Sequence, residues 1–168
     1  MKLSLIFLTV GFILVFLQTT FLHLLPLGSI VPDLILVLCV YWGLYHPTTG
    51  AVFGSFFLGY SVDVFSSPLL GLNAFAMSLV FLAVYLSSRC IWVHNLVLSA
   101  VVVFCASWIK GFALMLVWAF FLTEESFWTG VLKSIFLDAI VASILAPGIF
   151  SLLKRGESYL EEAKRVPL

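Results

Sequence analysis

Residues 32–73, PDLILVLCVYWGLYHPTTGAVFGSFFLGYSVDVFSSPLLGLN, decide how the chain is organised. Two apolar segments are joined by a turn at His46-Pro47, because a proline disfavours helix in the residue before it. The first segment begins at Pro32-Asp33, a pair that suits a helix N-terminus. The second segment ends near Asp63 and runs into a loop that contains Pro and Gly. The stretch therefore predicts a helical hairpin with both carboxylates at its open end.

The composition of the chain sets its class. Hydrophobic residues make up 63% of the sequence and charged residues 10%, against about 45–50% and about 25% in soluble domains. A chain of 168 residues cannot bury that much apolar surface in a water-facing fold. We expect an all-α integral membrane protein that no linker divides. The formal net charge of zero gives no reason to expect binding to nucleic acid.

Apolar runs and the Pro, Gly and Thr clusters between them predict a compact bundle of about six transmembrane helices. We expect a transmembrane domain over residues 1–153 and a short tail over residues 154–168. The second and third helices are short for a full crossing, so a re-entrant hairpin beside four full spans is the alternative. The predicted helices are Leu3–Leu25, Pro32–Tyr45, Thr49–Val64, Leu72–Ser87, Asn95–Leu122 and Phe127–Leu153.

The basic residues predict the orientation of the bundle. Lys2, Arg89, Lys154 and Arg155 lie on one side of a six-helix path, and the connections on the other side carry no Lys or Arg. Cytoplasmic loops are enriched in these residues. Both termini are therefore expected in the cytoplasm, with a solvated tail whose basic pair touches lipid headgroups.

Ionisable residues inside apolar helices are costly and usually face the interior of a bundle. Lys110 and Asp138 are such residues, and they lie equally far in sequence from the acidic turn at Glu124. In an antiparallel hairpin this symmetry places them at the same depth. We therefore predict that they form an ion pair between the fifth and sixth helices.

The outer-face carboxylates also require partners. Lys133 lies about two turns into the sixth predicted helix, so its side chain either extends outward to the membrane surface or serves as the counter-ion of Asp33 or Asp63. A carboxylate at a helix C-terminus opposes the helix dipole, so Asp63 needs a lysine, the amide of Asn73 or a partner protein. Structural roles are accordingly expected for Pro32, Asp33, Lys110, Lys133 and Asp138.

Small residues recur four apart in the third predicted helix, at Gly50 and Gly54 and again at Ser55 and Gly59. Such a stripe lets another backbone approach closely. The stripe and the loop after it are candidate partner interfaces, or else both pack only the helices of this chain. The candidates are Gly50, Gly54, Gly59, Asp63, Pro68, Gly71 and Asn73.

No reaction centre is recognisable in the sequence. The histidines His23, His46 and His94 never adjoin an acid at metal-ligand spacing, and the three cysteines include no CxxC pair. Phosphate-binding glycine loops and nucleophile motifs are absent as well. We expect no enzyme activity, no cofactor and no metal.

The same stretch resembles the rod shape-determining protein MreD family. The family begins its second apolar segment with PDL and ends it with a YWGL-like sequence. A glycine-rich segment follows, and the chain leaves it through spaced Asp, Pro, Gly and Ala residues. The matching residues here are Pro32-Asp33-Leu34, Tyr41-Trp42-Gly43-Leu44, Gly50 to Gly59, Asp63, Pro68, Gly71 and Ala74.

This resemblance implies a non-catalytic component of the bacterial inner membrane, in the machinery that elongates the cell wall and maintains rod shape. Its implied partners are the scaffold MreC, most directly, the actin-like MreB filament, RodA and a penicillin-binding transpeptidase, with membrane lipid around it. The alternative is a membrane-embedded substrate-binding subunit of a vitamin transporter, another compact six-helix protein. In that case the outer aspartates and Asn73 would line a substrate pocket.

Overall fold

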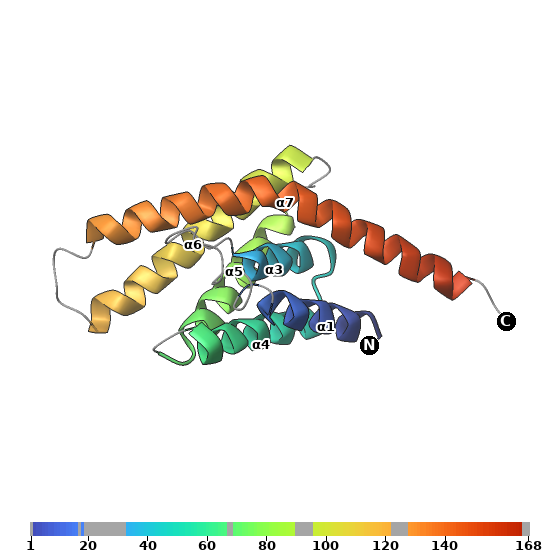
Figure 1. The fold of residues 1–168 in the computed structure, drawn as a ribbon, viewed down its shortest axis with the longest axis horizontal. Coiled ribbons are helices and arrows are strands. Elements are labelled where there is room, and N and C mark those ends of the chain that lie inside the picture. The colour runs from blue at the N-terminus through green and yellow to red at the C-terminus, as the bar shows by residue number, and fades with distance from the viewer. Residues whose placement is uncertain are drawn as a thin grey trace.

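The computed structural model describes residues 2–16, 18, 33–66, 69–89, 96–121 and 128–165, and these ranges are helical almost throughout (Figure 1). The described helices are α1 (Lys2–Phe16), α3 (Leu34–Tyr45), α4 (Thr49–Ser66), α5 (Leu72–Ser88), α6 (Leu96–Phe121) and α7 (Trp128–Arg165).

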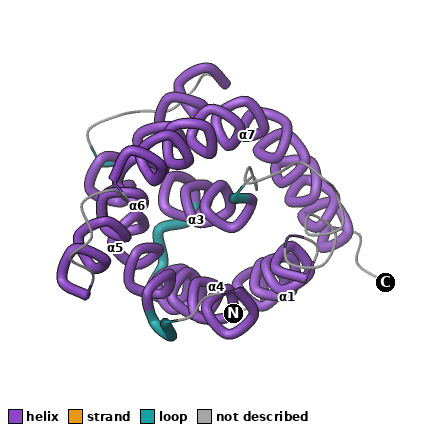
Figure 2. The backbone as a smooth tube through the Cα atoms, turned by 60° about the vertical axis from the view of Figure 1, so that its left-hand side comes forward, coloured by secondary structure: helices purple, strands orange, loops and turns teal. Residues whose placement is uncertain are grey.

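Helix α3 lies at the centre of the molecule. It contacts each of the other five described helices, and Figure 2 shows them arranged around it. Every residue from Ile35 to Gly43 is buried. A helix that is apolar on all sides is stable only where protein or lipid covers all of it. The sequence of α3 is of that kind, which explains its central place.

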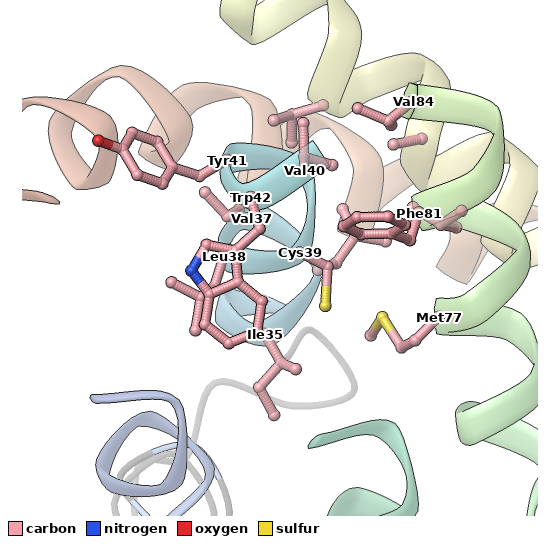
Figure 3. Close-up of a cluster of buried hydrophobic side chains, with 14 of the residues drawn as sticks. Ile35, Val37, Leu38, Cys39, Val40, Tyr41, Trp42, Met77, Phe81 and Val84 are labelled. Atoms are coloured by element: carbon pink, nitrogen blue, oxygen red, sulfur yellow. The ribbon is translucent and has the colours of Figure 1, made fainter. Parts of the chain in front are cut away.

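The core is formed by side chains that surround α3 (Figure 3). Cys39, Tyr41 and Trp42 of α3 are buried with Met77 and Phe81 of α5. A Cβ atom added at Gly43 would lie 2.8 Å from a methyl group of Val84. Glycine at this position therefore allows α3 and α5 to pack closely.

The outside of the bundle is strongly apolar. Within the described residues, two segments are long and apolar enough to cross a membrane, Val97–Val117 and Leu132–Ser158, and only about a quarter of the most apolar part of each is buried in the protein. Large side chains such as Val97 and Ile144 are 76% and 71% exposed. Soluble proteins rarely expose so much contiguous apolar surface. These are features of a helical membrane protein.

The structure confirms the predicted helices where it describes them. The observed and predicted boundaries agree within two residues, except at the C-terminal ends of the first and sixth predicted helices. The first helix is described from Lys2 to Phe16, and the remainder of its predicted length lies outside the described residues. The predicted end of the sixth helix at Leu153 is wrong, because α7 continues to Arg165. Its last part is rich in Lys, Arg, Glu and Leu, which favour helix.

Helix α7 also contains Pro147. A proline within a helix removes one backbone hydrogen bond and bends the axis. Figure 1 shows α7 changing direction along its length, so that its C-terminal part extends past the other helices.

Candidate functional site

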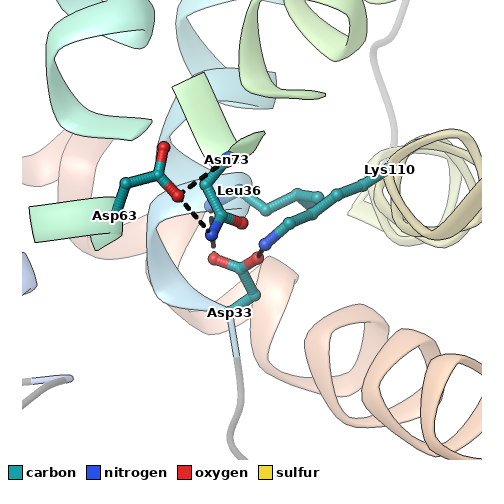
Figure 4. A network of polar contacts seen from close by, with 5 residues as sticks. All are labelled: Asp33, Leu36, Asp63, Asn73 and Lys110. Carbon is teal, nitrogen blue, oxygen red and sulfur yellow. Dashed lines mark hydrogen bonds and ion pairs between the residues drawn. The ribbon is translucent and has the colours of Figure 1, made fainter. Parts of the chain in front are cut away.

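Asp63, at the end of α4, caps the start of α5. It is 1% exposed, and its carboxylate accepts four hydrogen bonds. Oδ2 accepts from the backbone N–H groups of Gly71 and Ala74 at 3.1 and 3.0 Å. Oδ1 accepts from the backbone N–H and the side-chain amide of Asn73 at 3.0 and 2.9 Å (Figure 4). The first N–H groups of a helix have no partner within it, and Asp63 provides one from another helix.

This arrangement answers the question that the sequence raised about Asp63. Of the three partners considered for Asp63, the structure shows the Asn73 amide, and backbone N–H groups at the positive end of α5 complete the environment. Gly71 begins the helix with φ 93° and provides no side-chain cap. A residue with a side chain is strained at that angle. Gly71 and Asp63 therefore form one local motif.

The glycines of α4 pack against helices of the same chain. A Cβ atom at Gly54 would lie 2.7 Å from the indole ring of Trp42 in α3, and one at Gly59 would lie 2.7 Å from the backbone oxygen of Asn73 in α5. Gly50 is exposed, and Pro68 lies outside the described residues. The partner role of these residues stays a prediction. Gly54 and Gly59 could influence a partner only through the packing of α4.

Asp33 forms the N-terminus of α3. Its Oδ1 accepts a hydrogen bond from the backbone N–H of Leu36 at 3.0 Å, which is an N-cap. Its other carboxylate oxygen forms an ion pair with Lys110 of α6 (Figure 4). The structural role predicted for Asp33 thus has two components, a cap and an ion pair. Pro32 lies outside the described residues.

The predicted ion pair between Lys110 and Asp138 is wrong, since Lys110 pairs with Asp33. Symmetry about the Glu124 turn determines the depth of a residue but not the side of the helix on which it lies. Lys110 faces α3, which packs against α6. Asp138 still lies nearby, because both residues line one cavity.

This polar cavity has a volume of about 160 Å³. Two oxygen atoms in it, Oδ1 of Asp138 and Oε1 of Gln18, are buried and accept no hydrogen bond within the described part of the chain. The lining residues are Gln18, Asp33, Leu36, Ser107, Lys110, Gly111, Leu114, Ile135 and Asp138.

Lys133 does not have the role that its position suggested. Its side chain is exposed on α7 beside Leu132, Phe136 and Leu137. It forms no ion pair with any residue that the structure describes. Lys133 is therefore the counter-ion of neither Asp33 nor Asp63.

A second polar cluster joins the far end of α3 to the last part of α7, and sequence reasoning did not find it. Tyr41 donates a hydrogen bond to Oε2 of Glu157 at 2.8 Å, and Oε1 of Glu157 lies 2.6 Å from Nε2 of His46. The Lys154 ammonium lies 4.5 Å from the centre of the Tyr45 ring. These contacts hold residues of the predicted solvated tail against the centre of the bundle.

A signal for this cluster was present in the sequence. Phe150, Lys154 and Glu157 are spaced four and three apart, so a continuing helix places them on one face. Phe150 is buried, with its ring edge-on to that of Tyr41 at 5.2 Å. Extending the sixth helix by two turns would have predicted that Glu157 lies above the same surface.

Over the described ranges, no group of three or more His, Cys, Asp or Glu residues is arranged to hold a metal ion. The polar side chains described above are engaged mainly in capping helices and in joining them.

The fold and these sites define a compact helical membrane protein that encloses a short central helix and uses its buried polar groups to hold its helices together. A family model described as rod shape-determining protein MreD matches residues 1–155 of the 168-residue chain. The chain therefore belongs to the MreD family, whose members are non-enzymatic components of rod-shape determination. No curated protein and no solved structure matches it.

Family membership confirms the resemblance noted in residues 32–73 and extends it over most of the chain. Together with the apolar outer helices, it indicates a membrane protein with a role in cell shape.

Proposed function

We propose that the chain is a non-catalytic, multi-pass component of the bacterial inner membrane that links MreC, most directly, to MreB, RodA and a penicillin-binding transpeptidase. In this role it maintains rod shape during elongation of the cell wall. The proposal rests on the family match over residues 1–155. It is also supported by the engagement of Asp63 and Asp33 in the chain's own packing, because a scaffold needs a stable frame and not a reaction centre.

The surface proposed for MreC is the outward face of α4. Gly54 and Gly59 are covered by α3 and α5, so a partner of α4 must bind its opposite side. That side is unusually rich in aromatic side chains, which are enriched at protein interfaces. We call it the aromatic face of α4. It consists of Phe53, Phe56, Phe57 and Tyr60, all exposed.

The orientation proposed from the basic residues places both termini in the cytoplasm. In a six-span path, α3 and α7 both run towards the cytoplasm, so their C-terminal ends lie on one side. The contact of Glu157 in α7 with His46 at the end of α3 supports this arrangement.

The vitamin-transporter alternative receives little support from the geometry. Asp63 and Asn73 bind each other, and the remaining hydrogen bonds to the Asp63 carboxylate come from the backbone of the same loop and helix. The polar cavity of about 160 Å³ is smaller than the roughly 300–1,000 Å³ of sites that enclose small organic ligands.

The proposal can be tested by photocrosslinking in growing cells combined with affinity purification of the tagged chain. A photoreactive amino acid at Phe57, on the aromatic face of α4, should crosslink to MreC. The matched control is the same amino acid at Ile144 of α7, which is also apolar and is even more exposed. It should crosslink to MreC much less.

Mass spectrometry of the purified material distinguishes the two functions. Recovery of MreC, RodA or the transpeptidase supports the scaffold. Recovery of transporter ATPase subunits without these proteins would overturn it. Equal crosslinking from both positions would leave the scaffold standing but remove the aromatic face of α4 as the binding surface.

A further inference from the structure

The polar cavity between the start of α3, α6 and α7 carries an uncompensated charge. Three ionisable side chains line it, the carboxylates of Asp33 and Asp138 and the ammonium of Lys110. With all three ionised, the cavity holds one negative charge in excess. Both oxygens of Asp33 have partners, Lys110 and the N–H of Leu36. The excess charge therefore belongs to Asp138.

The surroundings make that charge costly. Asp138 and Lys110 both lie within the two segments that can span a membrane, and Leu36, Leu114 and Ile135 form the apolar part of the lining. An ion without a partner is strongly disfavoured in such a medium. Something must supply either a positive charge or a proton at Asp138.

The unpaired atoms indicate what fits. Oδ1 of Asp138 and Oε1 of Gln18 are both buried acceptors that receive no hydrogen bond within the described residues. The hydroxyl of Ser107 lines the same space. A carboxylate, an amide oxygen and a hydroxyl are hard oxygen ligands, the kind that bind alkali and alkaline-earth cations. A divalent ion would leave one positive charge in excess, whereas a monovalent ion neutralises the cavity.

We infer that the polar cavity binds one monovalent cation, a sodium ion or a proton, at Asp138. Gln18 and Ser107 provide neutral oxygen ligands, and Lys110 remains bound to Asp33. The bound ion joins α6 and α7 to Gln18, so its loss loosens this end of the bundle. The inference is independent of which proteins bind the outside of the molecule.

The test measures the thermal unfolding midpoint (Tm) of the full-length chain in detergent, followed by tryptophan fluorescence. Sodium chloride replaces choline chloride at constant ionic strength and fixed pH. A ligand that binds only the folded state raises Tm by mass action. At a tenfold excess of sodium over its Kd, we expect a rise of about 3–6 °C.

Two variants locate the ion. Asp138→Asn keeps the shape of the side chain and removes its charge, so it should fold and lose the sodium response. Gln18→Leu removes one neutral ligand, so the response should persist but require about tenfold more sodium, equivalent to one lost favourable contact. Glu157→Gln is the control, because it changes a carboxylate of α7 that contacts the opposite end of α3. This variant should retain the full Tm response to sodium.

A pH series distinguishes a sodium ion from a proton. Asp33 and Lys110 are the titratable groups that line the cavity with Asp138. If a proton is the ligand, the wild type gains Tm as pH falls, Asp138→Asn gains less, and sodium has no effect at any pH.

The inference is overturned if sodium and choline act alike and Asp138→Asn leaves the pH profile unchanged. It is equally overturned if Asp138→Asn retains the sodium response of the wild type. The comparison of sodium with choline uses the unaltered protein, so a sodium response is detected even if a variant fails to fold.

Discussion

At the scale of single residues, Asp63 shows how a carboxylate can be buried in this chain with no basic partner among the described residues. Three backbone N–H groups and one amide N–H converge on it. Hydrogen bonds to an ionised acceptor are stronger than neutral ones, and the positive end of the α5 dipole adds to them. The charge is therefore stabilised by the helix that it caps.

Replacing Asp63 with Ala should lower the free energy of unfolding by about 3–5 kcal/mol, because several buried donors lose their acceptor at once. Asp63→Asn keeps one acceptor oxygen and should cost about 1–2 kcal/mol. Chemical unfolding in detergent micelles measures both. Asn73→Ala is the matched control, since it removes only one of the four bonds and should cost about 1 kcal/mol. Equal losses for Asp63→Ala and Asn73→Ala would contradict the capping role.

The polar contacts differ in how far the sequence could predict them. Asp63 and Asn73 lie ten residues apart around one loop, so the dipole argument included the Asn73 amide among the three partners that it considered for Asp63. Lys110 and Asp33 lie on helices that are distant in sequence. Helical spacing predicts the depth of such residues, but the direction in which they point depends on which helices become neighbours. That information is held in the packing of the whole bundle, and so the partner of Lys110 was predicted incorrectly.

At the scale of helices, the small residues of α4 allow two neighbouring helices, α3 and α5, to pack closely against it. Gly54 allows approach of an α3 side chain, whereas Gly59 allows approach of the α5 backbone itself. The distinction matters because a side chain can turn away from an added methyl group, while the backbone of a packed helix cannot.

Gly59→Ala should therefore cost about 2–3 kcal/mol in the free energy of unfolding, by pushing α4 away from α5. Gly54→Ala should cost about 1 kcal/mol, since the indole of Trp42 can shift. Gly148→Ala is the control, because no atom lies within 4 Å of the added Cβ. It should be neutral or stabilising by about 0.5–1 kcal/mol. Equal losses at positions 59 and 148 would show that the close approach of α4 to α5 is not required.

The last part of α7 is a second case in which the observed structure differs from the prediction made from the sequence. The change from apolar to charged residues at Lys154 suggested that the helix ends there. The charged residues are good helix formers, however. The contacts of Glu157 with Tyr41 and His46 also stabilise the extended helix. Composition marked where the chain leaves the apolar region, which is a different boundary from the end of the helix.

Glu157→Ala should release this part of α7 without affecting membrane insertion. The loss of two polar contacts, worth about 1–2 kcal/mol, should increase the rate of trypsin cleavage after Lys154 and Arg155 by about 5–30-fold. Limited proteolysis of the purified chain measures this rate. Ser158→Ala is the control, since its hydroxyl bonds only to the Arg155 carbonyl among the described residues. Deletion of residues 157–168 should also leave insertion intact, and failure to insert would contradict this view of the tail.

At the scale of the whole molecule, the property that an experiment can test most directly is the orientation of the chain in the membrane. The sequence predicts the helices well because their apolar runs are long and their breaks carry Pro and Gly. It predicts orientation only from a few basic residues. The contact between the C-terminal parts of α3 and α7 constrains the two ends to one side without saying which side that is.

Reporter fusions resolve this point. Alkaline phosphatase fused after Leu70, in the connection between α4 and α5, should be active because that connection is expected outside the cytoplasm. The same enzyme fused after Leu168 should be inactive, and a green fluorescent protein there should be fluorescent. Phosphatase activity at the C-terminus would reverse the proposed orientation.

The central position of α3 has a consequence for biogenesis. Its 12 residues span about 18 Å, well short of the roughly 30 Å of a hydrocarbon core. A helix of this length does not match the bilayer when it is alone, yet it emerges from the ribosome before α5, α6 and α7. Helix α3 therefore reaches its final position only after the later helices have been made and have packed around it. Completion of synthesis, and not the insertion of α3 itself, would then be the event that commits the chain to its final form.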